Sequence, residues 1–263
     1  MRPHLAGLLV TVVLVCAPGA ALGQVTPLPP FIPPITDEAR KAAFPDVDGH
    51  PAHDDAVRAY VLFDQFEWHT GDGHDGILWD TKGWIGRDLD RLWLRTEGKA
   101  EDGNVRDAQA HMLYGRAFAR WWEFVGGVRQ DARPGPGRTW AAIGIQGLAP
   151  HWFEVEATAY IGAGGRTHFR VEIEYELLLT NRLVLQPLVE IEIYGKADRD
   201  RGIGAGLSSG EAGLRIRYEI RRELAPYVGV TWDRKFFGTA DAARAAGART
   251  RGARLALGLR WWR

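Results

Sequence analysis

Three consecutive runs between residues 150 and 195 alternate strictly between apolar and polar side chains, and this alternation constrains the fold more than any other feature. In the second run the apolar set is Phe169, Val171, Ile173, Tyr175, Leu177 and Leu179, and the polar set is His168, Arg170, Glu172, Glu174 and Glu176. Successive side chains on a β-strand point to opposite faces, so each run predicts a strand with one apolar and one charged face.

The length of these runs favours a membrane protein. Soluble strands average about 5–6 residues, whereas strands that cross a bilayer need about 9–11. The runs at 150–162, 167–180 and 182–195 belong to the longer kind, and almost no loop separates them. We therefore predict an all-β fold, a transmembrane antiparallel up-and-down β-barrel in the outer membrane, with apolar residues facing lipid and a carboxylate-rich interior.

Twelve strands can be counted from residue 57 onward. They lie near 57–68, 77–86, 89–100, 105–117, 119–131, 138–149, 151–162, 167–180, 182–195, 209–222, 225–237 and 252–262. Long connections follow the odd strands, at 69–76, 101–104, 132–137, 163–166, 196–208 and 238–251, and short turns follow the even ones. Outer-membrane barrels have short periplasmic turns, so both termini are predicted on the periplasmic side.

Two segments precede the barrel, which spans 57–263. Residues 1–23 have a basic start, an apolar core and small residues before position 24, as in a secretory signal peptide. The only cysteine, Cys16, lies within it, so we expect no disulfides in the mature chain. Residues 24–56 are proline-rich without apolar period and predict a disordered periplasmic leader. Charge balance, with 33 basic and 33 acidic residues, argues against nucleic acid as a partner.

The alternative fold is a soluble, secreted β-sandwich. It would need polar outward faces, but Leu214, Ile216, Leu255 and Leu257 make those faces apolar. Its core would also have to bury many unpaired charges, which is very costly. In a wet barrel interior, the acidic strands seven to nine and the arginine-rich strand ten can instead form ion pairs with each other.

Several long segments resemble the copper resistance protein B family of outer-membrane proteins. They are DQFEW (64–68), WIGRDLDRLWLRTEG (84–98), QGLAPHWFEVEATAY (146–160), EYELLLTNRLVLQP (174–187), YGK (194–196), GIGAGL (202–207), EAGLRIRYEIRRE (211–223), APYVGV (225–230) and FGTAD (237–241). The resemblance runs from residue 60 to the end. It implies a Gram-negative outer-membrane barrel, surrounded by outer-membrane lipid, that binds copper ions and supports copper tolerance beside periplasmic copper-handling proteins.

This chain departs from the family pattern in two respects. Family members often carry a segment rich in Met and His before the barrel, but here the mature chain has one methionine, Met112, and the leader has only His50 and His53. Capture of copper(I) by thioethers is therefore not expected in the leader. The chain also ends on Arg263 after two tryptophans, where an outer-membrane barrel usually ends on an aromatic residue.

Copper(II) prefers imidazole and carboxylate ligands, and copper(I) prefers thioether and imidazole. The first candidate site is the leader, where His50 and His53 precede Asp54 and Asp55. A flexible chain could place both imidazoles on one ion, and the alternative is an unstructured polar linker. The second candidate is the first outer loop, whose possible ligands are Glu67, His69, Asp72, His74 and Asp75. Its alternative is a hydrated surface loop.

The third candidate is the barrel interior. Strand parity predicts that Met112 faces inward with Tyr114 and Arg116, and that His111 then points outward. His168 is expected on the polar face, where it could add an imidazole to Glu172 and Glu174. The alternative is that interior charges pair with each other and fill the barrel.

The expected function is therefore copper binding that lowers copper toxicity, by sequestration or by outward passage. Two rival functions remain open. A narrow general porin would fit the same fold, and so would an outer-membrane lipid-active enzyme. The chain has only two serines, Ser208 and Ser209, in a glycine-rich segment without a Gly-x-Ser-x-Gly motif. Serine catalysis is therefore not expected, and we predict that the chain is not an enzyme.

Overall fold

The structure is a computed structural model that describes residues 36–43, 56–71 and 74–263. The chain divides into two units, Met1–Pro51 and Ala52–Arg263. In the first, the structure describes one helix, α1 (Asp37–Ala43), within the leader; its residues are exposed, and Thr36 caps it by accepting a hydrogen bond from the Ala39 amide. The predicted signal peptide and the candidate ligands His50 and His53 lie outside the described residues.

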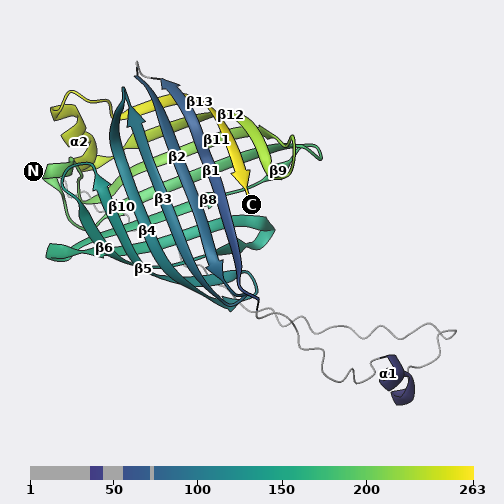
Figure 1. Ribbon diagram of the computed structural model, residues 1–263. Coiled ribbons are helices and arrows are strands. Elements are labelled where there is room, and N and C mark those ends of the chain that lie inside the picture. Colours follow the sequence, from purple (N-terminus) through teal and green to yellow (C-terminus); the bar gives the residue numbers. More distant parts are fainter. Residues whose placement is uncertain (1–35, 44–55, 72–73) are drawn as a thin grey trace, which may run out of the picture. The chain divides into compact units, whose positions relative to one another are not determined.

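The second unit is built almost entirely of long strands (Figure 1). They are β1 (Arg58–Gly71), β2 (His74–Gly86), β3 (Asp90–Glu101), β4 (Asn104–Ala119), β5 (Trp122–Arg133), β6 (Arg138–Ala149), β7 (Phe153–Gly162), β8 (Arg166–Glu174), β9 (Leu177–Leu178), β10 (Leu183–Tyr194), β11 (Gly206–Tyr218), β12 (Leu224–Lys235) and β13 (Arg251–Trp262). A helix, α2 (Phe237–Ala245), lies between β12 and β13. Within the described residues, no helix is long and apolar enough to cross a membrane.

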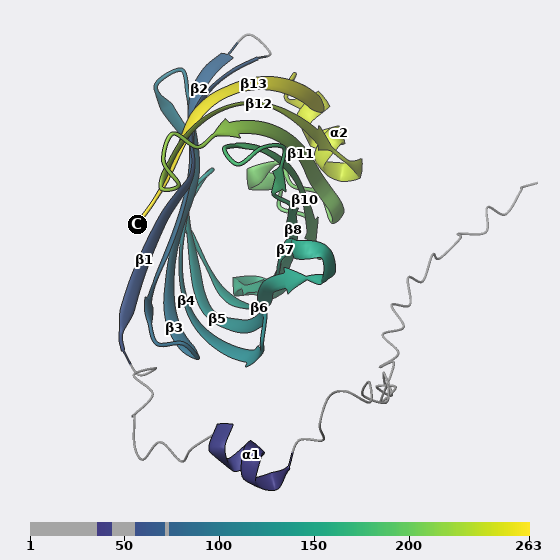
Figure 2. The ribbon, with the colours of Figure 1, turned by 90° about the vertical axis from the view of Figure 1, so that its right-hand side faces the viewer.

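The strands pair antiparallel in chain order, except that β8 and β9 both pair with β10 and not with each other, and the sheet closes on itself (Figure 2). Closure comes from β1, which pairs with β13 in a register that joins Leu62 to Trp262 and Thr70 to Leu255. Around the ring each strand therefore has a partner on both sides, except the two-residue β9, which pairs with β10 alone. The prediction of a closed up-and-down barrel of twelve strands is confirmed, because β8 and β9 occupy one position in the wall.

The gap between β8 and β9 has a local cause. The two segments pair with β10 on either side of Pro187, with Glu174 opposite Leu188 and Leu177 opposite Leu185. Proline has no N–H, so β10 cannot donate a hydrogen bond from this position. The ladder keeps only the bond from the Tyr175 amide to the Pro187 carbonyl, 3.1 Å. The strand predicted at 167–180 is therefore interrupted at residues 175–176.

The alternation of faces is confirmed in the strands that suggested it. Outward side chains are apolar and exposed, such as Ile173 at 40%, Ile216 at 42% and Leu257 at 57%. Inward side chains in the same strands are charged and buried, such as Glu174 at 4% and Arg215 at 1%. An apolar outer wall around a charged interior is the reverse of a soluble sheet protein, and it fits a barrel surrounded by lipid.

Strand β4 contradicts the predicted parity. Met112 is outward and 52% exposed, whereas His111 is inward and 4% exposed. Met112 pairs with Leu94 on one side and Val128 on the other, and both of these are exposed on the outer wall. Leu113 instead packs inside the barrel with a small apolar cluster, so β4 carries apolar residues on both faces and its sequence does not define which face is inward.

The connections also differ from the prediction in two places. The first loop, predicted at 69–76, is a tight hairpin in which Gly71 pairs with His74. His69 therefore belongs to β1 and Asp75 to β2, whereas the candidate ligand Asp72 lies outside the described residues. The connection predicted at 238–251 contains α2, which packs against the β11 end of the barrel, where Thr239 accepts a hydrogen bond from the Gly204 amide.

Candidate functional site

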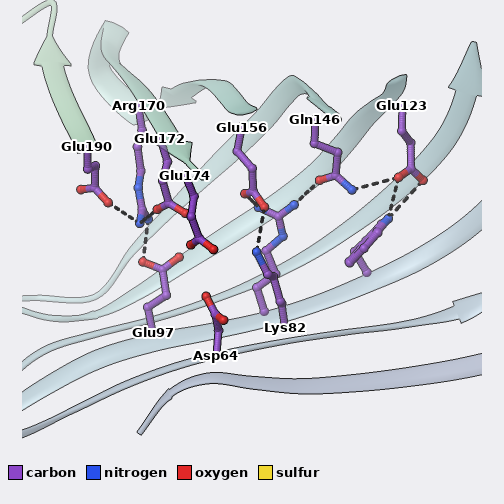
Figure 3. Close-up of polar contacts among 12 residues, drawn as sticks. Asp64, Lys82, Glu97, Glu123, Gln146, Glu156, Arg170, Glu172, Glu174 and Glu190 are labelled. Carbon is purple, nitrogen blue, oxygen red and sulfur yellow. Dashed lines mark hydrogen bonds and ion pairs between the residues drawn. The ribbon is translucent and has the colours of Figure 1, made fainter. Parts of the chain in front are cut away.

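A belt of ion pairs crosses the barrel interior near the middle of β2, β3, β7, β8 and β10 (Figure 3). It exists because the polar residues of these strands share the inward face. Its cations are Lys82, Arg95, Arg170 and Arg260, the last lying 2.6 Å from Asp64. Its carboxylates are Asp64, Asp80, Glu97, Glu156, Glu172, Glu174 and Glu190. Carboxylates outnumber cations in this set, so the belt presents a negative interior to ions entering from either end.

Arg170 on β8 is the first centre of the belt. Its guanidinium lies 2.6 Å from Glu97 on β3, 2.6 Å from Glu190 on β10 and 3.2 Å from Glu172 on its own strand. Gln109 donates a further hydrogen bond to Glu97, 2.8 Å. Because β3 and β8 are not neighbours in the sheet, the contact between Arg170 and Glu97 spans the interior rather than running along the wall.

Glu156 on β7 is the second centre. It accepts hydrogen bonds from Lys82, at 3.4 Å, and from Arg95. Arg95 also donates a hydrogen bond to the Gln146 side chain, and Gln146 in turn donates one to Glu123, at 2.9 Å. These contacts again join β2 and β3 to β6 and β7, which lie across the interior from them.

The belt leaves very little open space. The gap that it encloses has a volume of about 20 Å³ and is bordered by His111 as well as by Glu97 and Arg170. A gap of this size holds roughly one water molecule. Larger cavities of about 440 and 430 Å³ lie on either side, and each shares lining residues with the belt. The interior is therefore two cavities separated by a constriction.

A second set of buried ion pairs links β11 to β1. The Arg215 guanidinium lies 3.2 Å from Glu67 and donates to Gln65 at 2.8 Å, and the Tyr227 hydroxyl donates to Glu67 at 3.0 Å. The prediction that the arginine-rich strand faces acidic strands seven to nine is thus wrong for Arg215. It holds for Arg217, whose guanidinium lies 2.7 Å from Glu176 between β8 and β9.

His168 on β8 lies in a stack of aromatic rings. Tyr160 and Tyr194 cover its two faces at ring-centroid distances of 5.0 and 4.2 Å, and the residue is 1% exposed. Its Nδ1 lies 3.2 Å from the Arg129 guanidinium, and its Nε2 lies 3.4 Å from a Glu192 oxygen. The carboxylate partner is therefore Glu192 on β10. Glu172 and Glu174, the partners predicted from the sequence, bind Arg170 and Gln186 instead.

Two more histidines are buried on the inward face. His69 is 1% exposed, with its Nε2 3.9 Å from Glu101, and His111 lies edge-on to Tyr160 at 5.8 Å. Among the described residues, neither ring nitrogen of His69 or His111 makes a hydrogen bond, and the same is true of Nε2 in His168. These nitrogens are buried polar atoms without the partners that such atoms normally have.

The interior brings together fewer of the predicted ligands than the sequence suggested. Within residues 36–43, 56–71 and 74–263, no three His, Cys, Asp or Glu side chains are grouped as a ready metal site. Glu67 is occupied by Arg215 and Tyr227, and Met112 faces lipid. His74 is the first residue of β2, and its side chain is not among those described. Only His69 and His168 keep the predicted combination of a buried imidazole with a nearby carboxylate.

The sequence reading missed His111, Glu97 and Glu192 as site residues. Glu192 lies between Ile191 and Ile193 in an alternating run, which predicts that it faces inward. Its partner depends on the register that sets Tyr194 opposite His168. Glu97 carries the same signal, since it alternates with the outward Leu94 in β3. His111 had no clear signal because β4 is apolar on both faces.

The closed strand ladder, apolar outer wall and charged interior define this chain as an outer-membrane β-barrel. The barrel fold is shared with the NanC porin structure, at a TM-score of 0.52 and 10% identity, over 78% of this chain and 99% of that one. A family model described as copper resistance protein B precursor (CopB) matches residues 57–263, and the chain belongs to this family.

Two relatives support the assignment. The chain is 47% identical over 231 residues to copper resistance protein B of Escherichia coli, which covers 88% of this chain and 78% of the relative. It is 48% identical over 231 residues to a copper resistance protein B homolog of Pseudomonas syringae pv. tomato, which covers 88% of this chain and 79% of that protein.

Proposed function

We propose that this protein binds copper ions inside its barrel and so supports copper resistance by sequestering them at the outer membrane. Family membership supports the link to copper. The observation that carries the proposal is the set of buried histidines His69, His111 and His168. Among the described residues, both ring nitrogens of His69 and His111 and the Nε2 of His168 lack hydrogen-bond partners. A buried imidazole nitrogen with a free lone pair is a copper ligand that the fold has already desolvated.

Two of these histidines each lie near a carboxylate, at a distance that suits one ion bound between the imidazole and the carboxylate. Nε2 of His168 is 3.4 Å from Glu192, and Nε2 of His69 is 3.9 Å from Glu101. Two ligand atoms that each bind one ion at roughly 2 Å are about 3–4 Å apart. Imidazole with carboxylate is a donor set that suits copper(II). Small side-chain movements, with water as a further ligand, would complete each site.

The negative belt supplies the attraction for a cation. Its carboxylates outnumber its cations even with Arg260, the partner of Asp64, included, and the low-dielectric wall concentrates the field of these charges in the interior. His111 borders the narrow gap within the belt, so an ion held there would meet both an imidazole and Glu97. Sequestration and outward passage both begin with this step. The constriction of about 20 Å³ favours retention over free flow.

The same constriction weighs against a general porin, because a sugar cannot pass a gap that holds about one water.

We also propose that the protein has no catalytic role. Its two serines have partners that do not activate a nucleophile: Ser209 donates to Glu192 at 2.7 Å, and Ser208 shares a hydrogen bond with Thr239 at 2.9 Å. Among the described residues, neither serine is in contact with a histidine, the base that most often activates a nucleophilic serine.

Titration of the refolded full chain with copper(II) and copper(I), by calorimetry and metal analysis, tests the proposal. The variants His69→Gln, His111→Gln and His168→Gln each remove an imidazole. We expect at least one of them to weaken copper binding by about tenfold or more, since even outer-shell changes at metal sites cost about 10–100-fold. His151→Gln is the matched control, because His151 is exposed in the turn between β6 and β7.

Unchanged binding in all three variants would reject the interior as the copper site. In that case a His50→Gln, His53→Gln double variant tests the leader. Absence of copper binding above that of an unrelated barrel would reject the function as a whole. Proteoliposomes with an enclosed copper-sensitive dye separate retention from passage, because sequestration predicts bound copper without dye response.

A further inference from the structure

The outer wall carries a groove at one end of the barrel. It is the end where α2 lies, away from the end at which β13 finishes (Figure 1). We call it the outer groove; it has a volume of about 1090 Å³ and lies between the outer faces of β10 to β13 and the segment that follows α2. Its lining includes Val189, Ile191, Leu207, Trp232 and Phe236, and also four arginines, Arg234, Arg244, Arg249 and Arg251. Three carboxylates, Glu190, Glu211 and Asp233, also border it, but each is paired with an arginine of the interior, Arg170 or Arg254. An apolar groove with a basic rim is not part of the interior site described above.

The strand registers place these residues in two rows across the wall. The row nearer the rim is Ile191, Gly210, Arg234 and Arg251, each opposite the next on strands β10, β11, β12 and β13. The row below it, toward the middle of the wall, is Val189, Ala212, Trp232 and Ala253. The basic groups of the wall thus lie directly above apolar ones, as at the boundary between lipid head groups and acyl chains.

Small residues create the hollow. Gly210, Ala212 and Ala253 occupy outward positions where most of this wall carries Leu, Ile or Val. A Cβ at Gly210 would lie 3.5 Å from the Phe236 ring, which is an ordinary contact distance, so this ring borders the hollow directly beside the position without a side chain. The bulky Ile191 and Trp232 stand on either side of the hollow, so its floor is apolar and its walls are raised.

The two arginines of the upper row form an unfavourable pair. Arg234 and Arg251 are directly opposite each other on β12 and β13, and both are exposed. Like charges in such a cross-strand pair destabilise a sheet. Among the described residues neither has an ion pair with a carboxylate, and Arg234 contacts only the Phe236 ring, at 5.3 Å. An anion between the two guanidinium groups would turn this repulsion into attraction.

We propose that the outer groove binds a lipid of the outer leaflet whose phosphate groups give it a net negative charge, with a phosphate between Arg234 and Arg251 and an acyl chain along the floor. Charge complementarity selects the phosphate, and the apolar floor selects a lipid over a free anion. The short turns at the opposite end of the barrel place the groove on the outer side of the membrane. This binding site is independent of the copper site in the interior.

Native mass spectrometry of the full chain in detergent, titrated with diphosphorylated lipid A, tests the proposal. We expect lipid A to bind and phosphatidylcholine to bind far more weakly. The Arg234→Gln, Arg251→Gln double variant should weaken lipid A binding by about tenfold or more, because hydrogen bonds to charged groups contribute about 1.5–3 kcal/mol each. Heat-modified migration on gels confirms that each variant is folded.

Two controls separate the parts of the site. Arg182→Gln with Arg221→Gln removes the same charge from exposed positions at the terminus end, and it should leave lipid A binding unchanged. Ala212→Leu with Ala253→Leu fills the floor without changing charge, and it should weaken lipid A binding. Inorganic pyrophosphate, the third probe, should compete poorly because it has no acyl chain.

Equal lipid A binding by the wild type and the double arginine variant would overturn the proposal. So would full competition by pyrophosphate together with normal binding by the filled-floor variant, because the groove would then be a site for free anions rather than for lipid.

Discussion

The arginines inside the barrel and those of the outer groove are held in opposite ways. Inside, Arg170 contacts three carboxylates and Arg215 contacts Glu67, so each positive charge is balanced by the protein itself. In the outer groove, Arg234 and Arg251 face each other, and neither has a carboxylate partner among the described residues. The protein thus neutralises the arginine charges of its interior with its own carboxylates, whereas the two groove arginines can be neutralised by a bound anion.

This difference predicts whether each substitution raises or lowers the free energy of unfolding. A buried charge that loses its partner retains the cost of desolvation without compensation, so interior substitutions destabilise strongly. A charge that repels its neighbour contributes nothing favourable in the absence of a ligand, so a groove substitution costs little or even stabilises. The predictions below test this contrast, from the largest expected effect to the smallest.

The largest effect is expected at Arg215, whose side chain is 2% exposed. Arg215→Met leaves Glu67 buried with only the Tyr227 hydroxyl as a close donor, and we expect a loss of about 3–5 kcal/mol in unfolding free energy. Urea unfolding of the barrel in vesicles, followed by tryptophan fluorescence, measures it. The Arg215→Met, Glu67→Leu double variant should recover most of the loss. A double variant as unstable as the single one would show that packing rather than charge explains the effect.

A smaller loss of stability and a change of permeability are expected at Arg170. Its side chain is 13% exposed, so water compensates part of the lost contacts with Glu97 and Glu190. We expect Arg170→Gln to cost about 2 kcal/mol and to raise single-channel conductance in planar bilayers, because the constriction loses its central cation. Arg116→Gln is the control, since its pair with Asp90 is exposed at the terminus end. Equal conductance in both variants would mean that the belt does not close the barrel.

The fold was predictable from sequence because period-two alternation and strand length together specify a lipid-facing wall. The alternation correctly placed Glu172, Glu174 and Arg215 inside. It failed at Met112, where β4 has apolar residues on both faces and only the pairing with Leu94 and Val128 decides the orientation. The composition of α2 did carry a helical signal, since four of its nine residues are alanine, which has the highest helix propensity.

The candidate site was less predictable because it depends on contacts between distant parts of the chain. Arg215 and Glu67 are 148 residues apart, and Arg170 and Glu97 are 73 apart. Which inward residues meet depends on the shear of the closed barrel, and sequence alternation does not specify shear. The pairing of His168 with Glu192 rather than with Glu172 has the same origin. The outer groove likewise appears only when the registers align Gly210, Ala212 and Ala253.

The smallest effect, with the opposite sign, is expected at Arg251. In vesicles of phosphatidylcholine, Arg251→Gln removes one half of the like-charged pair, and we expect unfolding free energy to rise by about 0.2–0.5 kcal/mol. Arg254→Gln is the matched control, because Arg254 lies three residues along β13 on the inward face, 2.9 Å from Glu211 and 3.1 Å from Asp233. That variant should be destabilised. When lipid A is added to the vesicles, the unfolding free energy of the wild type should rise and that of Arg251→Gln should not. The wild type should then be the more stable of the two. If Arg251→Gln destabilises the barrel without lipid A, the groove arginines have partners within the protein, and the contrast between the outer wall and the interior does not hold.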